Sequence, residues 1–171
     1  MSRIGIGFLL ALPALSSQAQ TQRTSVAIDK KDRLTFERVP FSATGKTFKY
    51  VANKQPNGTK TLIAINGKPV FGTDGELPKY TLNKASVLFK RHSYLLPVSG
   101  MYNPWFGQKL DKQFVQLKKA GDTLTIQAVF SDGAGSYLAE WKIDGDSAKR
   151  TLLTADDAVV TGFFQSNPGG E

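Results

Sequence analysis

Residues suited to covalent catalysis are scarce in this chain. Cysteine is absent and His92 is the only histidine. A thiol nucleophile and a zinc site with several histidine ligands are therefore excluded, and a Ser-His-Asp triad would have to use His92. The acidic pairs Asp144/Asp146 and Asp156/Asp157 lie in expected turns, and no spacing singles out the two carboxylates that a glycosidase needs. We expect no catalytic residues, no metal and no cofactor, with His92 an ordinary surface or turn residue.

A glycine-flanked aspartate marks the segment Gly72–Lys79. Two glycines around Asp74 favour a tight turn in which its carboxylate accepts hydrogen bonds from the following amides. The functional alternative is that Asp74 and Glu76 bind a cation, although a calcium loop supplies more closely spaced oxygen ligands. The turn is favoured, and Asp74 is retained as a candidate partner-binding residue.

Three aromatic residues crowd the segment Ser99–Gly107, namely Tyr102, Trp105 and Phe106. Such a loop either plugs one end of the core or forms a recognition patch, because Trp and Tyr bring large contact areas at low entropic cost. The core plug is the favoured alternative. As a recognition patch, the same three residues are candidates for binding a partner.

The glycines of a second segment, Ser131–Tyr137, would allow the close backbone approach that a phosphate-binding loop needs. It lacks the Gly-Lys-Ser/Thr sequence of a P-loop and no helix is expected after it, so a hairpin connection explains it better. Tyr137 shares one face of the following strand with Trp141, while Glu140 and Lys142 take the other face. Tyr137 is a further candidate partner-binding residue.

The chain is basic, with 22 Lys and Arg against 14 Asp and Glu, a net charge of +8. A cationic surface attracts anionic polymers, lipid headgroups or an acidic protein, and the alternative is a solvated face that only aids solubility. Lys90 and Arg91 are the basic candidates for partner binding. The wider basic set is Lys84, Lys90, Arg91, Lys109, Lys112, Lys118 and Lys119.

The first nineteen residues have the pattern of a secretory signal peptide. Arg3 precedes an apolar run over residues 4–15, and Ser17-Gln18-Ala19 supplies the small residues that a signal peptidase reads. Cleavage after Ala19 removes one positive charge, so the mature charge falls from +8 to +7. We expect a periplasmic or secreted protein that does not bind nucleic acid. No later apolar segment approaches membrane-spanning length.

Short apolar runs broken by Gly, Asn, Asp and Pro predict an all-β fold, a single antiparallel β-sandwich or open barrel. Asn66-Gly67 between β-prone runs predicts a hairpin, and Asp144-Gly145 predicts another between strands at 136–143 and 147–154. Residues 158–165 read as a last strand. Residues 109–119 allow one short helix or an edge strand.

The expected domain organisation is simple. After the signal peptide at 1–19, residues 20–33 form a flexible leader or a frayed first strand. Residues 34–165 form one β domain, and residues 166–171 form a C-terminal tail.

Three motifs together resemble those of a bacterial family of small exported proteins whose members are mostly uncharacterised. They are GKPVFGTDG at 67–75, MYNPW at 101–105, and SDGAGSY at 131–137 followed by Trp141. The resemblance covers residues 62–154. It implies a shared β fold with glycine-dependent turns and brings no catalytic residues. By size, location and class alone, the chain is also similar to periplasmic immunity proteins that neutralise cell-wall-degrading toxins.

These features favour an exported, non-catalytic binding protein, a periplasmic inhibitor or immunity protein. Its partner would be a toxin or cell-wall hydrolase, with an acidic surface that suits the basic chain. The alternative is a cationic envelope protein that binds anionic cell-wall polymer or lipid headgroups. A third hypothesis, a hydrolase that uses His92 or paired acids, has no supporting motif.

Overall fold

The computed structural model describes residues 20–28, 30–52, 60–105, 110, 112–131 and 133–166. The strands are β1 (Gln22–Ala27), β2 (Arg33–Pro40), β3 (Phe48–Ala52), β4 (Lys60–Ile65), β5 (Lys68–Pro69), β6 (Tyr80–Phe89), β7 (His92–Leu96), β8 (Val115–Ala120), β9 (Thr123–Phe130), β10 (Tyr137–Asp144) and β11 (Ser147–Thr154). Two 3₁₀ turns, η1 (Lys112–Phe114) and η2 (Gly133–Gly135), precede β8 and β10, and α1 (Asp157–Ser166) follows β11. None of the helices described is long and apolar enough to cross a membrane.

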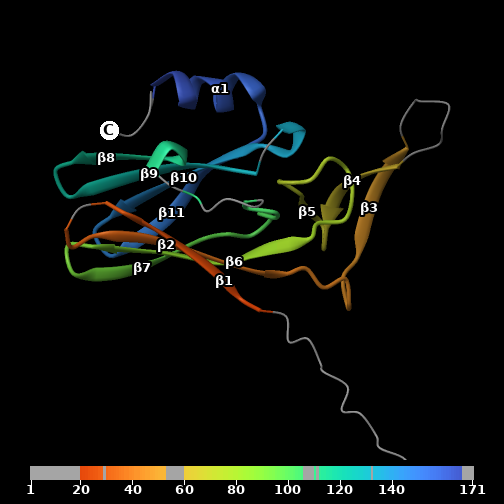
Figure 1. Cartoon of the computed structure of the whole chain (residues 1–171), viewed down its shortest axis with the longest axis horizontal. Helices are drawn as coiled ribbons and strands as arrows, with labels where there is room; N and C mark the ends of the chain where they lie inside the picture. Colours follow the sequence, from red (N-terminus) through yellow and green to blue (C-terminus); the bar gives the residue numbers. More distant parts are fainter. Residues whose placement is uncertain are drawn as a thin grey trace, which may run out of the picture.

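Two four-stranded antiparallel sheets pack face to face, with strand orders β1-β2-β6-β7 and β11-β10-β9-β8 (Figure 1). Alternate residues of each strand point into the space between the sheets, where Phe36, Val87, Ile126 and Trp141 are fully buried. The predicted alternation on β10 is confirmed, because Tyr137, Trp141 and Ile143 are buried on the inner face. The predicted all-β, sandwich-like fold is confirmed.

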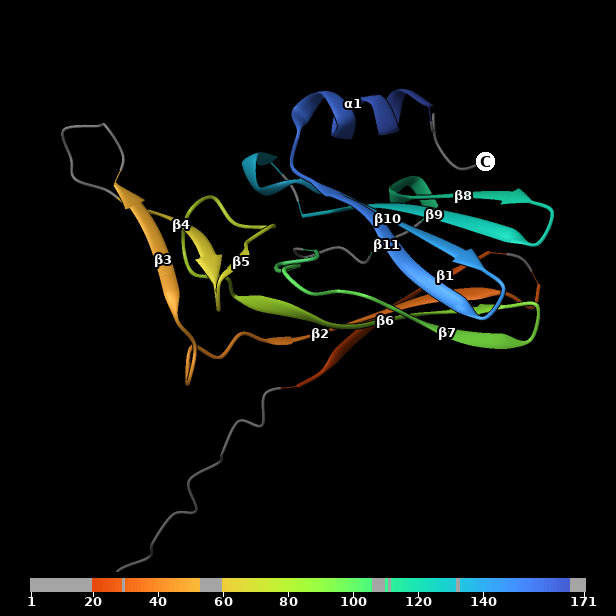
Figure 2. The same ribbon diagram turned by 180° about the vertical axis from the view of Figure 1, so that it is seen from behind.

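A third sheet, β3-β4-β5, lies at one end of the sandwich, and the turns β6–β7, β8–β9 and β10–β11 lie at the other (Figures 1 and 2). The Asn66-Gly67 hairpin is confirmed between β4 and β5, with φ of 50° and 72° at its two central residues. We call β3, β4 and β5 the small sheet. The chain that leaves it, Gly72–Lys79, contacts β4 again where Leu62 N–H donates to Gly75 O at 2.7 Å.

The prediction of a last strand at 158–165 is wrong, because these residues form α1. Asp156 caps the helix, with its Oδ1 accepting a hydrogen bond of 2.8 Å from Ala158 N–H. Val160 and Phe163, three residues apart, form a buried cluster with Val129 and Leu138 on the outer face of the second sheet. This face is therefore covered by a helix in part rather than wholly solvated.

Two further expectations are corrected by the sheet pairing. Residues 112–120 form the turn η1 and then the edge strand β8, so the short helix expected near 109–119 is wrong and the edge-strand alternative is right. Of the two expectations for residues 20–33, a flexible leader or a frayed first strand, the strand is the one observed, because Gln22–Ala27 pair with β2 along the full length of β1. Thr24 and Val26 are buried on its inner side, while Arg23 and Glu37 form an outer ion pair at 2.7 Å.

Candidate functional site

The three motifs noted in the sequence meet at one place in the fold. Phe71 forms a parallel bridge with Met101, in which Phe71 N–H donates to Gly100 O and Tyr102 N–H donates to Phe71 O, both at 3.0 Å. Ser131 N–H donates to Pro104 O at 3.0 Å and brings in the third motif. Segments about thirty residues apart in the chain thus form one junction between the sandwich and the small sheet.

Asn103 holds this junction together. Its Oδ1 accepts hydrogen bonds of 2.9 Å from Lys79 N–H and Tyr80 N–H, and its Nδ2 donates one of 2.8 Å to Gly72 O. The side chain is buried and the backbone φ is +39°, a left-handed conformation that Asn tolerates better than most residues. The role of Asn103 is therefore to fix the course of two backbone segments.

Gly72 allows the closest approach in the junction. Its φ is +92°, and a Cβ built on it would lie 2.0 Å from Tyr102 O and 2.8 Å from Tyr137 Cε1. The Tyr137 hydroxyl donates to the same Tyr102 O at 3.0 Å. Burial raises the pKa of Tyr137 well above its ordinary value, against a smaller opposing effect of Arg150, so the phenol stays a neutral donor.

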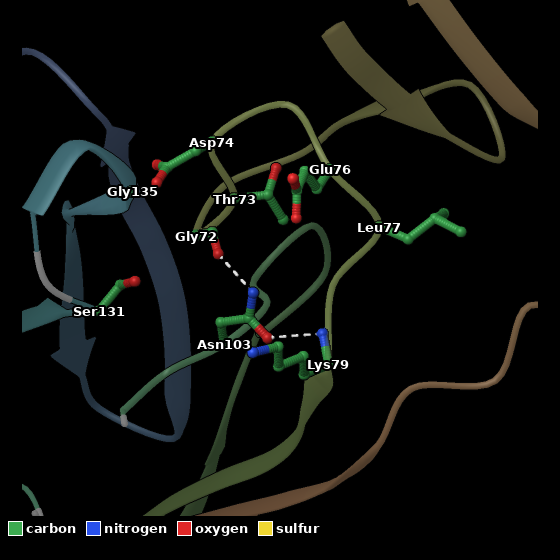
Figure 3. Close-up of a pocket in the computed structure, with 9 residues that line it drawn as sticks. All are labelled: Gly72, Thr73, Asp74, Glu76, Leu77, Lys79, Asn103, Ser131 and Gly135. Carbon is green, nitrogen blue, oxygen red and sulfur yellow. Dashed lines mark hydrogen bonds between the residues drawn. The ribbon is translucent and has the colours of Figure 1, made fainter. Parts of the chain in front are cut away.

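An open pocket of about 270 Å³ lies beside the junction (Figure 3). Its lining residues are Gly72, Thr73, Asp74, Glu76, Leu77, Lys79, Asn103, Ser131 and Gly135. Asp74 Oδ1 and Ser131 Oγ each lie 3.2 Å from the position of a Cβ on Gly135, so this glycine leaves the space between them open. The pocket offers carboxylate and hydroxyl oxygens to a ligand with hydrogen-bond donors.

Ser131 is conspicuous in this pocket. Its φ is +66°, and its Oγ is buried without a hydrogen-bond partner among the described residues.

The expectation that Asp74 lies in a turn agrees with the loop that surrounds it. Across the described part of the chain, no three acidic or histidine side chains come together as metal ligands.

Aromatic side chains lead from the junction onto the small sheet. The ring centroids are 5.8 Å apart for Tyr102 and Phe41, 6.4 Å for Phe41 and Phe48, and 6.5 Å for Phe48 and Tyr50. We call these four residues the aromatic strip. It ends on β3, where Tyr50 is 43% exposed and its neighbour Val51 49%.

The predicted partner-binding residues do not form one patch. Asp74 lies in the pocket, and Tyr102 is half-buried at the start of the aromatic strip. Lys90 and Arg91 lie in the β6–β7 turn at the opposite end of the sandwich (Figure 1). Exposed His92 follows them on β7, as expected of a surface residue.

Trp105 and Tyr137 belong to the core, and they are corrected here as partner-binding candidates. Trp105 is 6% exposed and Tyr137 is not exposed at all. The guanidinium carbon of Arg38 lies 4.6 Å from the ring centroid of Trp105 and 4.0 Å from that of Tyr80. The core-plug alternative therefore describes Trp105, while Phe106 lies outside the described residues.

Sequence reasoning missed Asn103 and most of the aromatic strip. A signal for the strip was present, since residues 41–73 hold four aromatic residues and five lysines but no Asp or Glu. No signal in the sequence marked Asn103, because its three bonds join backbone groups more than twenty residues away.

Comparison with known proteins found no matching family model, no matching curated protein and no matching solved structure. The resemblance based on the three motifs stays a prediction.

Proposed function

We propose that this protein acts by binding another protein, as an exported inhibitor or immunity protein directed at an acidic toxin or cell-wall hydrolase. The small sheet and the aromatic strip are the proposed contact surface. The observation that carries the proposal is the exposure of Tyr50 and Val51, at 43% and 49%, on a strand that no core covers. Export is predicted from residues 1–19 alone.

Exposed aromatic residues support contact with a protein surface. A Tyr side chain buries a large area while losing little conformational freedom, which is why Tyr is common among the residues that dominate binding energy. Tyr50 is backed by Phe48, and Phe48 by Phe41, so its ring packs against neighbours rather than standing alone. A contact surface held in this way loses less entropy on binding.

The charge of the same region supports an acidic partner. Residues 41–73 carry five lysines and no Asp or Glu. Lys46 Nζ lies 5.8 Å from the ring centroid of Phe41, so a positive charge borders the aromatic strip itself. Complementary charge on the partner would speed association and favour the correct orientation.

The strand order of the small sheet adds a third argument. β3 pairs with β4 alone and forms an edge of the sheet in the order β3-β4-β5. An edge strand presents backbone donors and acceptors with which an extended segment of a partner can pair. The side chains of Tyr50 and Val51 would then supply specificity on either side of the new strand.

The proposal is tested with residues 20–171 as bait in extracts of sibling and toxin-bearing cells, at low and moderate salt. Wild type should retain one acidic protein at moderate salt, and Tyr50→Ala should lose it. Leu95→Ala is the matched control, because Leu95 is 67% exposed on β7, away from the small sheet. The retained protein should then lose lytic activity on isolated cell wall when the bait is added.

Two results would overturn the proposal. If wild type and Tyr50→Ala retain the partner protein equally, the contact surface does not include the exposed face of the small sheet. Retention of only polymer or lipid, lost as salt rises, would make the protein an electrostatic envelope binder instead.

A further inference from the structure

A second binding site is indicated by the two-residue hairpin turns. Within the described residues, four hairpins turn at Asn66-Gly67, Lys90-Arg91, Gly121-Asp122 and Gly145-Asp146. Three of them place a glycine at positive φ, the conformation that costs glycine least. The β6–β7 turn is the exception, with Lys90 at φ 50° and Arg91 at φ 66°.

Lys-Arg is a poor sequence for such a turn. Side chains with a Cβ are disfavoured at positive φ, and Asn-Gly is the preferred pair where both central residues need it. The same chain uses Asn66-Gly67 in a turn with φ of 50° and 72°, nearly the same geometry. A strained backbone at two adjacent basic residues points to a use for their side chains.

The turn places these side chains at a pocket of about 370 Å³ lined by Lys31, Asp32, Lys90 and Arg91. We call it the cationic pocket. Asp32 is buried and anchors the turn, its Oδ1 accepting a hydrogen bond of 3.2 Å from Lys90 N–H. Lys119 Nζ reaches Asp32 Oδ2 at 3.6 Å from the β8–β9 hairpin.

Among the residues that the structure describes around this pocket, positive charges outnumber negative ones. Four cations, Lys31, Lys90, Arg91 and Lys119, face Asp32 and the exposed Asp122, which forms an ion pair with Lys90. Among the described residues, Arg91 has no ion-pair or hydrogen-bond partner. Its planar guanidinium matches the geometry of a phosphate group and can donate two parallel hydrogen bonds.

We propose that the cationic pocket binds a phosphoryl group, with Arg91 as the residue that contacts it and Lys90 and Lys31 as neighbouring positive charges. The group belongs to a free phosphate or to a phospholipid headgroup, and both present the same oxygens. This site lies at the opposite end of the sandwich from the small sheet (Figures 1 and 2). It is therefore independent of the function proposed above.

The first test is titration of residues 20–171 with sodium phosphate, followed by amide NMR, against sodium chloride at equal ionic strength. Phosphate should cause saturable shifts at the amides of the β6–β7 turn. Arg91→Gln should weaken binding by about tenfold or more, since hydrogen bonds to charged groups are the stronger class. Lys84→Gln, an exposed lysine on β6 outside the pocket, should bind like wild type.

A second variant separates binding from folding. Replacing the turn by Lys90→Asn with Arg91→Gly installs the preferred turn sequence, so the thermal midpoint should rise by about 3 °C while phosphate binding is lost. If the variant is more stable than wild type and no longer binds phosphate, unfolding cannot explain the loss of binding.

A vesicle experiment distinguishes the two sources of phosphate. Sedimentation with phosphatidylglycerol vesicles that depends on Arg91 assigns the site to a headgroup, whereas phosphate binding without sedimentation assigns it to a soluble phosphate. Equal shifts with chloride would overturn the proposal. Phosphate affinity unchanged in Arg91→Gln would do the same, because the diffuse charge of the chain would then account for binding.

Discussion

The side-chain amide of Asn103 donates a hydrogen bond of 2.8 Å to the carbonyl oxygen of Gly72. The two residues are 31 positions apart, and each has a backbone φ in the left-handed region. The bond joins the loop after β5 to the loop before η1, so the pocket and the start of the aromatic strip share one fixed base. The stability of this junction is the most direct property to test.

Gly72→Ala should be among the most destabilising single substitutions in the chain. The new methyl group would lie 2.0 Å from a backbone oxygen, Tyr102 O, at a φ of +92°. We expect a loss of about 3 to 5 kcal/mol in the free energy of unfolding, measured by urea denaturation. Gly67→Ala is the control, because its φ is +72° but nothing lies within 4 Å, and it should cost about 1 kcal/mol. Equal losses for the two variants would contradict the junction geometry.

Asn103→Ala removes the three hydrogen bonds made by the side chain. With each net bond contributing about 1 kcal/mol, the unfolding free energy should fall by about 3 kcal/mol. Asn103→Asp keeps the acceptor and restores a donor only when the new carboxyl is protonated. Burial and the Gly72 carbonyl oxygen favour the neutral carboxyl, against the two backbone N–H donors that favour the charged form. The folded pKa of that carboxyl should therefore lie above its unfolded value, so Asn103→Asp should approach wild type near pH 4 and lose stability as the pH rises. A pH-independent deficit would argue against donation to Gly72.

Tyr137→Phe should change how stability depends on alkaline pH. At pH 7 the lost hydrogen bond to Tyr102 O should cost about 1 kcal/mol. Because burial raises the folded pKa of Tyr137, the stability that depends on a protonated phenol is present below about pH 10 and is lost above it. The variant has no such group to ionise, so its deficit should shrink in urea titrations above pH 10. Arg150, the neighbouring charge that opposes this shift, is unchanged in both proteins.

Phe163→Ala should release α1 from the second sheet. Phe163 is 4% exposed in a cluster with Val129 and Leu138, and its truncation should cost about 3 kcal/mol. Phe164→Ala removes an adjacent ring that is 41% exposed, and its cost should stay near or below about 1 kcal/mol. Hydrogen exchange of the α1 amides measures both effects, and equal protection in the two variants would show that Phe163 does not dock the helix.

Local sequence predicted the Asn66-Gly67 hairpin because its geometry depends on the turn residues themselves, and it placed the β10–β11 turn one residue early, at Asp144-Gly145 and not at Gly145-Asp146. Asn66-Gly67 can adopt two positive φ values at little cost, and the flanking runs have the alternation of strands. The inner face of β10 was predictable from strand alternation, because Tyr137, Trp141 and Ile143 are separated by even numbers of residues and therefore lie on the same face. The site was predicted only in part, through Asp74 and Tyr102.

Residues 158–165 show why local sequence was insufficient elsewhere. Their apolar residues fit a strand or one face of a helix, and the choice depends on the Asp156 cap and on contacts with Val129 and Leu138. Those two residues belong to β9 and β10, which precede this segment in the sequence. A short apolar run contains no information about which surface will cover it.

By itself, the sequence determined the all-β class, the Asn66-Gly67 hairpin and the positive charge, because these follow from residue types and their spacing along the chain. Tertiary structure alone decided that Trp105 and Tyr137 are buried, that Asp74 lies beside Ser131, and that Lys90 and Arg91 meet Lys31 at the far end. These relationships join segments separated by tens of residues. They depend on which faces of the sheets exclude water, a property of the packed molecule and not of any one segment.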